Sequence, residues 1–156
     1  MIKLVRIDHR LLHGQVVFSW TKSLNISRII VIDDLAAKDE LKKMSLSLSK
    51  PSGVLLNIFS VSEALSKMPK VEQLKENVML IFGDTKGTLK FCKGYPKIQE
   101  INYGGIAKKE NSKQYSNAIF LNEEELSDSK QLKEMGINLY MQQIPTSKKE
   151  DLTSKI

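Results

Sequence analysis

Both histidines of the chain, His9 and His13, lie in the segment 6–17, which reads RIDHRLLHGQVV. A neutral imidazole can act as a nucleophile, and its ordinary pKa of about 6.5 leaves most of it neutral at pH 7. Gly14 follows His13 and is expected to begin a helix, whose free N–H groups attract phosphate with about 0.3–1 kcal/mol. A charge-assisted hydrogen bond from Arg10 would add about 1.5–3 kcal/mol. The segment therefore predicts phosphoryl chemistry on His13, with Arg10 as the stronger phosphate ligand and the helix end as the weaker one.

Asp8 is a candidate to orient the imidazole of His13. Its carboxylate could accept a proton from one ring nitrogen and leave the lone pair of the other facing a phosphoryl donor. Asp8 would raise the pKa of His13 and Arg10 would lower it, so the net direction does not follow from the sequence. Gly14 has no side chain, which would let the backbone approach a phosphoryl group closely. The structural alternative is a polar loop with surface histidines.

Other site chemistries fit the residues less well. The chain contains neither of the common nucleotide-binding glycine motifs, and the segment 83–88 (GDTKGT) is better interpreted as the start of a helix. His9 and His13 have the spacing of a metal pair, but an arginine lies between them and there is no clear third ligand, so no metal site is predicted. Asp33 and Asp34 could form a metal or acid–base pair. The favoured interpretation is that they cap the next helix, with one carboxylate reaching the site.

The elements that must position these residues alternate between strands and helices. Apolar runs predict strands at 3–7, 28–32, 54–59, 78–82, 98–102, 118–121 and 137–141, the last of them ending before Pro145. Apolar spacings of three and four, with capping signals at Ser60 and Asn122, predict helices at 14–24, 37–48, 61–68, 85–93 and from Asn122 to Gly136. Gly104 and Gly105 are expected in a turn or loop, and residues 147–156 in a short helix or tail. The prediction is a three-layer α/β/α domain with a mainly parallel sheet.

Ligands of such sheets bind beyond the carboxyl ends of the strands. The expected strand ends carry five groups of polar residues, of which the first is the richest. They are 8–13, 33–34, Ser60, 83–85 and 102–105.

Composition and charge limit the classes of function. With 156 residues, 41% hydrophobic and 27% charged, the chain is expected to form one globular domain over residues 1–156. No apolar run is long enough to span a membrane, and Lys3 and Arg6 come too early for a signal peptide. The single cysteine, Cys92, is expected in the core, and a reducing cytoplasm is the simplest compartment. The net charge of +6 is scattered, which favours a solvated surface, with nucleic-acid binding as the alternative.

The segment 6–16 resembles the R-[IV]-D-x-R-L-[IL]-H-G-Q-V motif of enzyme IIB of the mannose-family phosphotransferase system (PTS). Four further segments are similar to that family across nearly the whole chain. They are 27–39 (SRIIVIDDLAAKD), 51–54 (PSGV), 101–106 (INYGGI) and 136–137 (GI). The chain departs from the family at His9, where many members have Asp, and at the loop 82–84, which weakens any assignment to mannose itself.

The resemblance implies a phosphocarrier, with the reaction class of a protein-N(π)-phosphohistidine–sugar phosphotransferase. The phosphoryl group would pass from a histidine of IIA to His13, by family analogy to its Nδ1, and then to a sugar imported through IIC and IID. Asp8, Arg10, Gly14 and Gln15 would be the loop neighbours of His13. A more distant set is His9, Asp33, Asn102 and Gly104.

No metal or other cofactor is implied, and nucleic acid is not an expected partner. The implied location is cytoplasmic, peripherally associated with the membrane permease. A homodimer is left open, as are the sugar and the role of His9. The alternatives are a basic nucleic-acid-binding module and a regulatory protein in which phosphohistidine signals rather than feeds a sugar.

Overall fold

A computed structural model describes all 156 residues. Its strands are β1 (Ile2–Asp8), β2 (Arg28–Ile32), β3 (Leu55–Phe59), β4 (Val78–Phe82), β5 (Glu100–Gly105), β6 (Lys113–Ser116), β7 (Ile119–Leu121), β8 (Asn138–Met141) and β9 (Glu150–Asp151). Its helices are α1 (Gly14–Ser23), α2 (Asp34–Lys38), α3 (Glu40–Ser49), α4 (Val61–Glu72), α5 (Thr85–Gly94) and α6 (Glu123–Glu134), with a final 3-10 turn at Thr153–Lys155.

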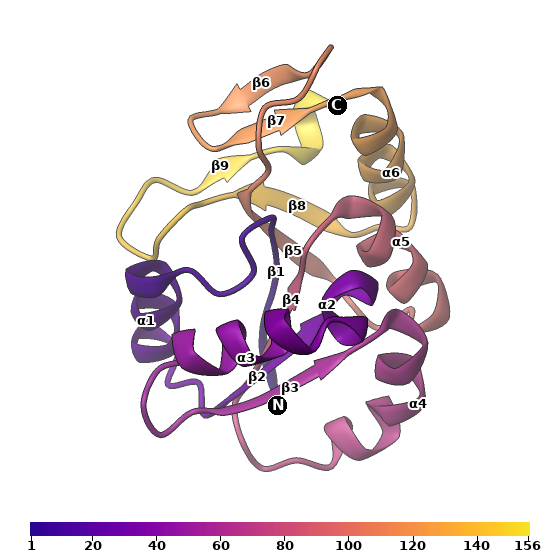
Figure 1. The fold of residues 1–156 in the computed structure, drawn as a ribbon. Coiled ribbons are helices and arrows are strands. Elements are labelled where there is room, and N and C mark those ends of the chain that lie inside the picture. The colour runs from indigo at the N-terminus through magenta and orange to yellow at the C-terminus, as the bar shows by residue number, and fades with distance from the viewer.

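Seven strands form one sheet in the order β3-β2-β4-β1-β5-β8-β9 (Figure 1). Every neighbouring pair is parallel except β8 with β9, and β6 and β7 form a separate antiparallel pair. β1 lies near the middle, with Ile7 beside Phe82 of β4 and Arg6 beside Asn102 of β5. The loop that follows β1 therefore emerges between the carboxyl ends of two other strands, where ligands of such sheets bind.

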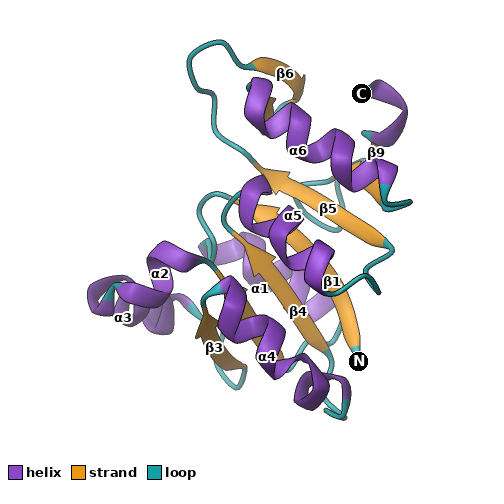
Figure 2. Cartoon of the chain, turned by 90° about the vertical axis from the view of Figure 1, so that its right-hand side faces the viewer, coloured by secondary structure: helices purple, strands orange, loops and turns teal.

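Helices cover both faces of the sheet, which confirms the predicted three layers. α4, α5 and α6 lie on the face turned toward the viewer in Figure 2, with α1 behind the sheet. The core under α4 to α6 contains 25 buried residues, including Val5 and Ile7 of β1. The core under α1 and α3 contains 14, including Leu4 of the same strand. Alternate residues of β1 thus enter opposite cores, which fixes its register.

The predicted strands and helices are largely confirmed, including the two capping boxes at Ser60–Glu63 and Asn122–Glu125. Two predictions are wrong, and one strand was not predicted. Gly104 and Gly105 are the last residues of β5 rather than a turn, because β5 extends to pair with β1 at Asp8. The strand at 138–141 is not the last, because β9 follows it within the expected tail. β6 was not predicted, since its sequence KQYS carries little apolar signal.

The single helix expected over 37–48 is two helices, divided at Asp39. Its backbone is extended (φ −113°, ψ 104°), its N–H closes α2, and its carboxylate caps α3 at the N–H of Lys42. Leu46 is the only fully buried residue of α3. Leu41, Met44 and Leu48 lie on the opposite side and are 78%, 62% and 84% exposed. The apolar spacing correctly indicated a helix, but its most regular stripe faces outward.

No helix combines the length and the apolar character needed to cross a membrane.

Candidate functional site

The loop from His9 to His13 is held on both sides by the fold. The N–H of His9 donates to the carbonyl of Gly105 at 2.9 Å, which ties the loop to the end of β5. The N–H of Leu11 donates to the carbonyl of Asp8 at 2.9 Å and closes a turn. Leu11 and Leu12 are buried in the core under α1, and Leu11 has a φ of +61°, which is uncommon for a residue other than glycine. Buried leucines thus anchor a loop whose two histidines are exposed.

His13 is the N-cap residue of α1. Its backbone is extended (φ −126°, ψ 94°), and its carbonyl accepts from the N–H of Val16 at 2.9 Å. Its imidazole is exposed and makes no hydrogen bond within the chain. Gly14 has a φ of +34°, and a Cβ there would meet no atom within 4 Å. The exposed ring therefore lies at the start of a helix whose first N–H groups have no intrahelical acceptors.

Asp8 is buried and accepts hydrogen bonds from two arginines. Its Oδ1 takes the backbone N–H of Arg10 at 3.0 Å and Nε of Arg10 at 3.1 Å. Its Oδ2 takes Nη2 of Arg10 at 3.1 Å and Nη2 of Arg6 at 3.0 Å. The expected contact between Asp8 and the ring of His13 is absent. The nearest imidazole nitrogen is Nδ1 of His9, at 3.9 Å from Oδ1. The carboxylate orients Arg10 instead.

Burial alone would raise the pKa of Asp8, but hydrogen bonds from Arg10 and the charge of Arg6 outweigh it and hold the pKa below its ordinary value. The same burial lowers the pKa of the Arg6 guanidinium, although Asp8 opposes that change. Asp8 is therefore a carboxylate at neutral pH. With two guanidiniums beside it, the three groups together carry one net positive charge, a suitable environment for an anion.

Arg6 explains the positions of Asn102 and Gly104. Nη1 of Arg6 donates to Oδ1 of Asn102 at 2.6 Å and to the carbonyl of Gln142 at 3.2 Å. The guanidinium carbon lies 5.6 Å from the centre of the Trp20 ring, and a Cβ on Gly104 would overlap the guanidinium. Asn102 and Gly104, which we expected near the site, thus lie against Arg6, which in turn donates to Asp8.

Asp33 caps the next helix, α2, as favoured from the sequence, whereas Asp34 accepts from the start of the later helix α4. Asp33 accepts from the N–H of Ala36 at 2.9 Å, and Asp34 accepts from the N–H of Val61, the first residue of α4, at 2.9 Å. A Cβ on Gly83 would meet Oδ1 of Asp33 at 2.5 Å and the side chain of Leu11 at 3.4 Å, so Asp33 lies near the base of the loop. Burial, together with the charges of Asp84 and Asp34, raises the pKa of Asp33.

The remaining predicted residues lie at the surface around His13. Gln15 is exposed in the first turn of α1, and its carbonyl accepts from the hydroxyl of Ser19 at 2.7 Å. Arg10 is 27% exposed, and its Nη1 makes no hydrogen bond within the chain. Sequence reasoning did not assign a role to Arg6, although an arginine in the middle of an apolar strand is a signal of a buried ionic partner.

Comparison with known families matches residues 2–156 to the model described as PTS system sorbose subfamily IIB component. The chain belongs to this IIB family. Among its relatives, the mannose-specific EIIAB component of Escherichia coli K12 is 36% identical over the whole chain, which spans 49% of that protein's length. The sorbose-specific EIIB component of Lacticaseibacillus casei is 30% identical over the whole chain and 95% of the relative.

Solved structures of IIB domains have the same fold as this IIB chain. The crystal structure of manxB from Thermoanaerobacter tengcongensis has a TM-score of 0.90 and 34% identity, covering 99% of this chain and 93% of the other. The IIBSor domain of the sorbose permease from Klebsiella pneumoniae has a TM-score of 0.91 and 28% identity, covering 99% and 95%. The single α/β domain predicted from the sequence is thus the fold of the family.

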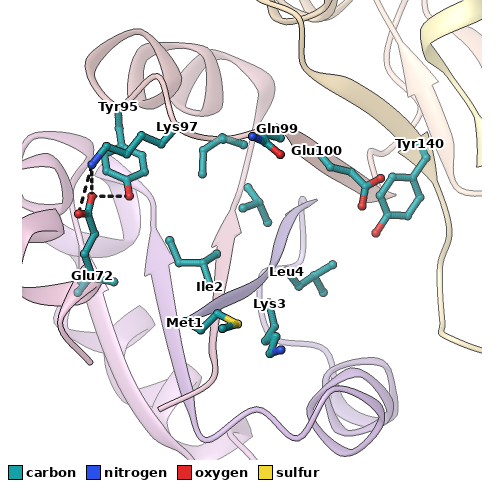
Figure 3. A pocket seen from close by; sticks show the side chains of 13 residues that line it. Met1, Ile2, Lys3, Leu4, Glu72, Tyr95, Lys97, Gln99, Glu100 and Tyr140 are labelled. Carbon is teal, nitrogen blue, oxygen red and sulfur yellow. Dashed lines mark hydrogen bonds and ion pairs between the residues drawn. The ribbon is translucent and has the colours of Figure 1, made fainter. Parts of the chain in front are cut away.

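Figure 3 shows a cavity of this IIB chain that is lined by residues 1–5, at the amino-terminal end of β1, whereas His13 follows the carboxyl end of that strand. Its volume is about 420 Å³, and it opens where the amino-terminal half of β1 is not paired with β5. Its rim carries Glu72, which accepts from the Tyr95 hydroxyl at 2.7 Å and from Nζ of Lys97 at 2.9 Å. None of the predicted site residues lines it. Of the predicted site residues, Gly104 lines a second cavity and Asp33 a third, and neither of these two cavities is lined by His13 or Arg10.

Proposed function

We propose that this IIB component carries a phosphoryl group on His13 between a IIA donor protein and a sugar presented by a membrane permease of the IIC/IID type. The observation that carries the proposal is the exposed imidazole at the N-terminus of α1, three residues after an arginine whose guanidinium is fixed by a buried carboxylate. A carrier that serves two partners in turn needs its acceptor on an open surface, because each partner must bring its own group to the ring.

In the first step a ring nitrogen of neutral His13 attacks the phosphorus of a phosphohistidine on IIA. A new N–P bond forms as the old one breaks, and the histidine of IIA leaves with its electron pair. The family resemblance assigns the bond to Nδ1 of His13. Arg10 holds an equatorial phosphoryl oxygen through Nη1, and the N–H groups of Gly14 and Gln15 face the same charge.

In the second step a sugar hydroxyl attacks phospho-His13, the N–P bond breaks, and the hydroxyl proton is released. The charge of the Arg6–Asp8–Arg10 group helps to hold the phosphoryl oxygens during both displacements. The chemistry uses only residues of the chain and its partners, and His9 is not a required member. We further propose that the protein works in the cytoplasm, against the inner face of the permease.

The test is transfer of labelled phosphate from a phosphorylated mannose-family IIA, followed by peptide mapping. We expect label on His13, complete loss of label in His13→Ala, and retention of most of it in His9→Ala. Since His9 lies in the same loop and is also exposed, His9→Ala is the matched control. Label on His9 alone would reject the assignment. Reconstitution with IIC and IID and a panel of hexoses and amino sugars then identifies the sugar.

A further inference from the structure

Arg6 is a charged residue buried in the interior of the domain. It lies in β1 with 1% of its side chain exposed, against 27% for Arg10 and 20% for Arg28, the other two arginines of the chain. It does not reach the surface at His13, so it cannot contact a phosphoryl group there. Its hydrogen bonds go to Asp8, Asn102 and the carbonyl of Gln142. A buried cation is retained at a cost in desolvation, which calls for a role beyond packing.

The contact of Arg6 with Asp8 changes the net charge that Asp8 and Arg10 together present to a phosphoryl group. A one-to-one pair of Asp8 with Arg10 would be neutral, and the carboxylate would compete with a phosphate for the same guanidinium. Arg6 shares Oδ2 of Asp8 with Arg10, at 3.0 and 3.1 Å. The carboxylate is thereby divided between two cations. Nη1 of Arg10 is left without a partner in the chain, and the group has a net positive charge facing the loop.

Three features fix the position of Arg6. Asn102 is its paired neighbour on β5 and accepts its Nη1 at 2.6 Å. The absence of a side chain at Gly104 leaves the space that the guanidinium fills, and the ring of Trp20 lies 5.6 Å away. A planar guanidinium can reach Asp8 with one nitrogen and Asn102 with the other. The single ammonium of lysine cannot reproduce that bridge.

We infer that Arg6 is a positioning residue for phosphoryl transfer, which acts through Asp8 to hold Arg10 in place and to keep its charge available to the phosphoryl group on His13. This inference rests on the proposed function. It assigns to the motif at 101–106 the task of holding Arg6, rather than of contacting phosphate.

Arg28 offers a matched control. It is also a strand arginine, and it donates to both carboxylate oxygens of Glu76 at 2.9 and 3.1 Å and to Oδ1 of Asn57 at 2.6 Å. It lies at the opening residue of β2, at the end of the sheet away from the His13 loop. Arg28→Lys therefore removes the same kind of bridge without touching the site.

The experiment measures phosphorylation of His13 by phosphoramidate, a small phosphoryl donor that needs no partner protein. We expect Arg6→Lys to lower the rate at saturating donor at least tenfold and Arg28→Lys to change it less than twofold. The decisive measurement is a double-mutant cycle with Arg10→Met. If Arg6 acts through Arg10, then Arg6→Lys changes the rate less than twofold in the Arg10→Met background. A merely structural role would lower both backgrounds equally.

Asn102→Ala provides a second variant if Arg6→Lys does not fold, as checked by its thermal unfolding. It removes the 2.6 Å bond to Arg6 while Arg6 keeps its bond to Asp8. We expect a smaller rate loss that also disappears in the Arg10→Met background. Equal losses in both backgrounds, or a normal rate in both Arg6→Lys and Asn102→Ala, would overturn the role of Arg6. Neither result would contradict the proposed function. Failure of the wild-type chain to take label on His13 from either phosphoramidate or IIA would overturn both proposals.

Discussion

The guanidinium of Arg10 lies edge-on against the carboxylate of Asp8, with Nε 3.1 Å from Oδ1 and Nη2 3.1 Å from Oδ2. The backbone N–H of the same arginine donates to Oδ1 at 3.0 Å. The carboxylate of Asp8 thus fixes both the backbone of the loop at Arg10 and the plane of the Arg10 guanidinium. Such bidentate pairs combine geometric specificity with a strong hydrogen bond.

Asp8→Asn removes the negative charge from between two arginines with little change of shape. We expect a loss of about 3–5 kcal/mol in the free energy of unfolding at pH 7, because two cations are left without their counter-charge. The pKa of Asp8 is lowered in the fold, so this stabilisation is present above its ordinary value of 3.8 and is lost as the pH falls through the folded value. Urea unfolding of wild type and variant should converge toward low pH. A constant difference across that range would contradict this account.

Asp33→Asn should raise the free energy of unfolding at pH 7, whereas Asp8→Asn should lower it. The pKa of Asp33 is raised in the fold by burial and by the charges of Asp84 and Asp34, so its charged form is disfavoured at pH 7. Asparagine can still accept the N–H of Ala36 and cap α2. We expect a higher free energy of unfolding at pH 7, with the gain vanishing as the pH falls through the raised folded pKa toward 3.8. A loss of stability at pH 7 would show that the charge serves the fold.

Leu46→Ala and Leu48→Ala test the two apolar sides of α3. Leu46 is 2% exposed and is the residue by which α3 enters the core, so its truncation should cost about 2–5 kcal/mol in the free energy of unfolding. Leu48 is two residues away in the same helix but points outward, so its truncation should change stability by about 0.5 kcal/mol or less. Chemical denaturation of the two variants side by side decides this. Similar losses would mean that the outer stripe is covered in solution.

Cys92 should be unreactive in the folded protein. Its thiol is fully buried in the core under α4 to α6, and burial raises its pKa to about 12. The thiolate is the reactive form, so a thiol reagent at pH 8 should modify it only at the rate at which the protein opens. Complete reaction should follow within minutes in denaturing urea. Rapid labelling without denaturant would place Cys92 outside the core.

Much of the fold follows from local patterns. The continuous apolar run 29–32 after Arg28 and the capping box at Ser60 predict their elements directly, because strand burial and helix capping depend on neighbouring residues. The division at Asp39 was missed because an aspartate inside a helix and an aspartate at an N-cap look alike in the sequence. β9 was missed because two polar residues form a strand only through their pairing with β8.

The candidate site likewise contains residues that follow from local sequence and residues that depend on the pairing of distant strands. The choice of His13, Gly14 and Arg10 follows from residue types and spacing within one short segment. The partner of Asp8 does not, because it depends on Arg6, which is two residues away in the same strand, and on Asn102, which is 96 residues from Arg6 along the chain. Only the register of β1 against β5 brings that set together.

Trp20 is the only tryptophan of the chain and lies in α1, about two turns beyond His13. Its indole N–H donates to the carbonyl of Gln143 at 3.0 Å, and its ring faces the guanidinium of Arg6. Its fluorescence therefore comes from a single emitter within the electric field of the ionic cluster. Arrival of a phosphoryl dianion at the head of the same helix should shift that emission, which gives an unlabelled optical signal for loading and unloading of the carrier in real time.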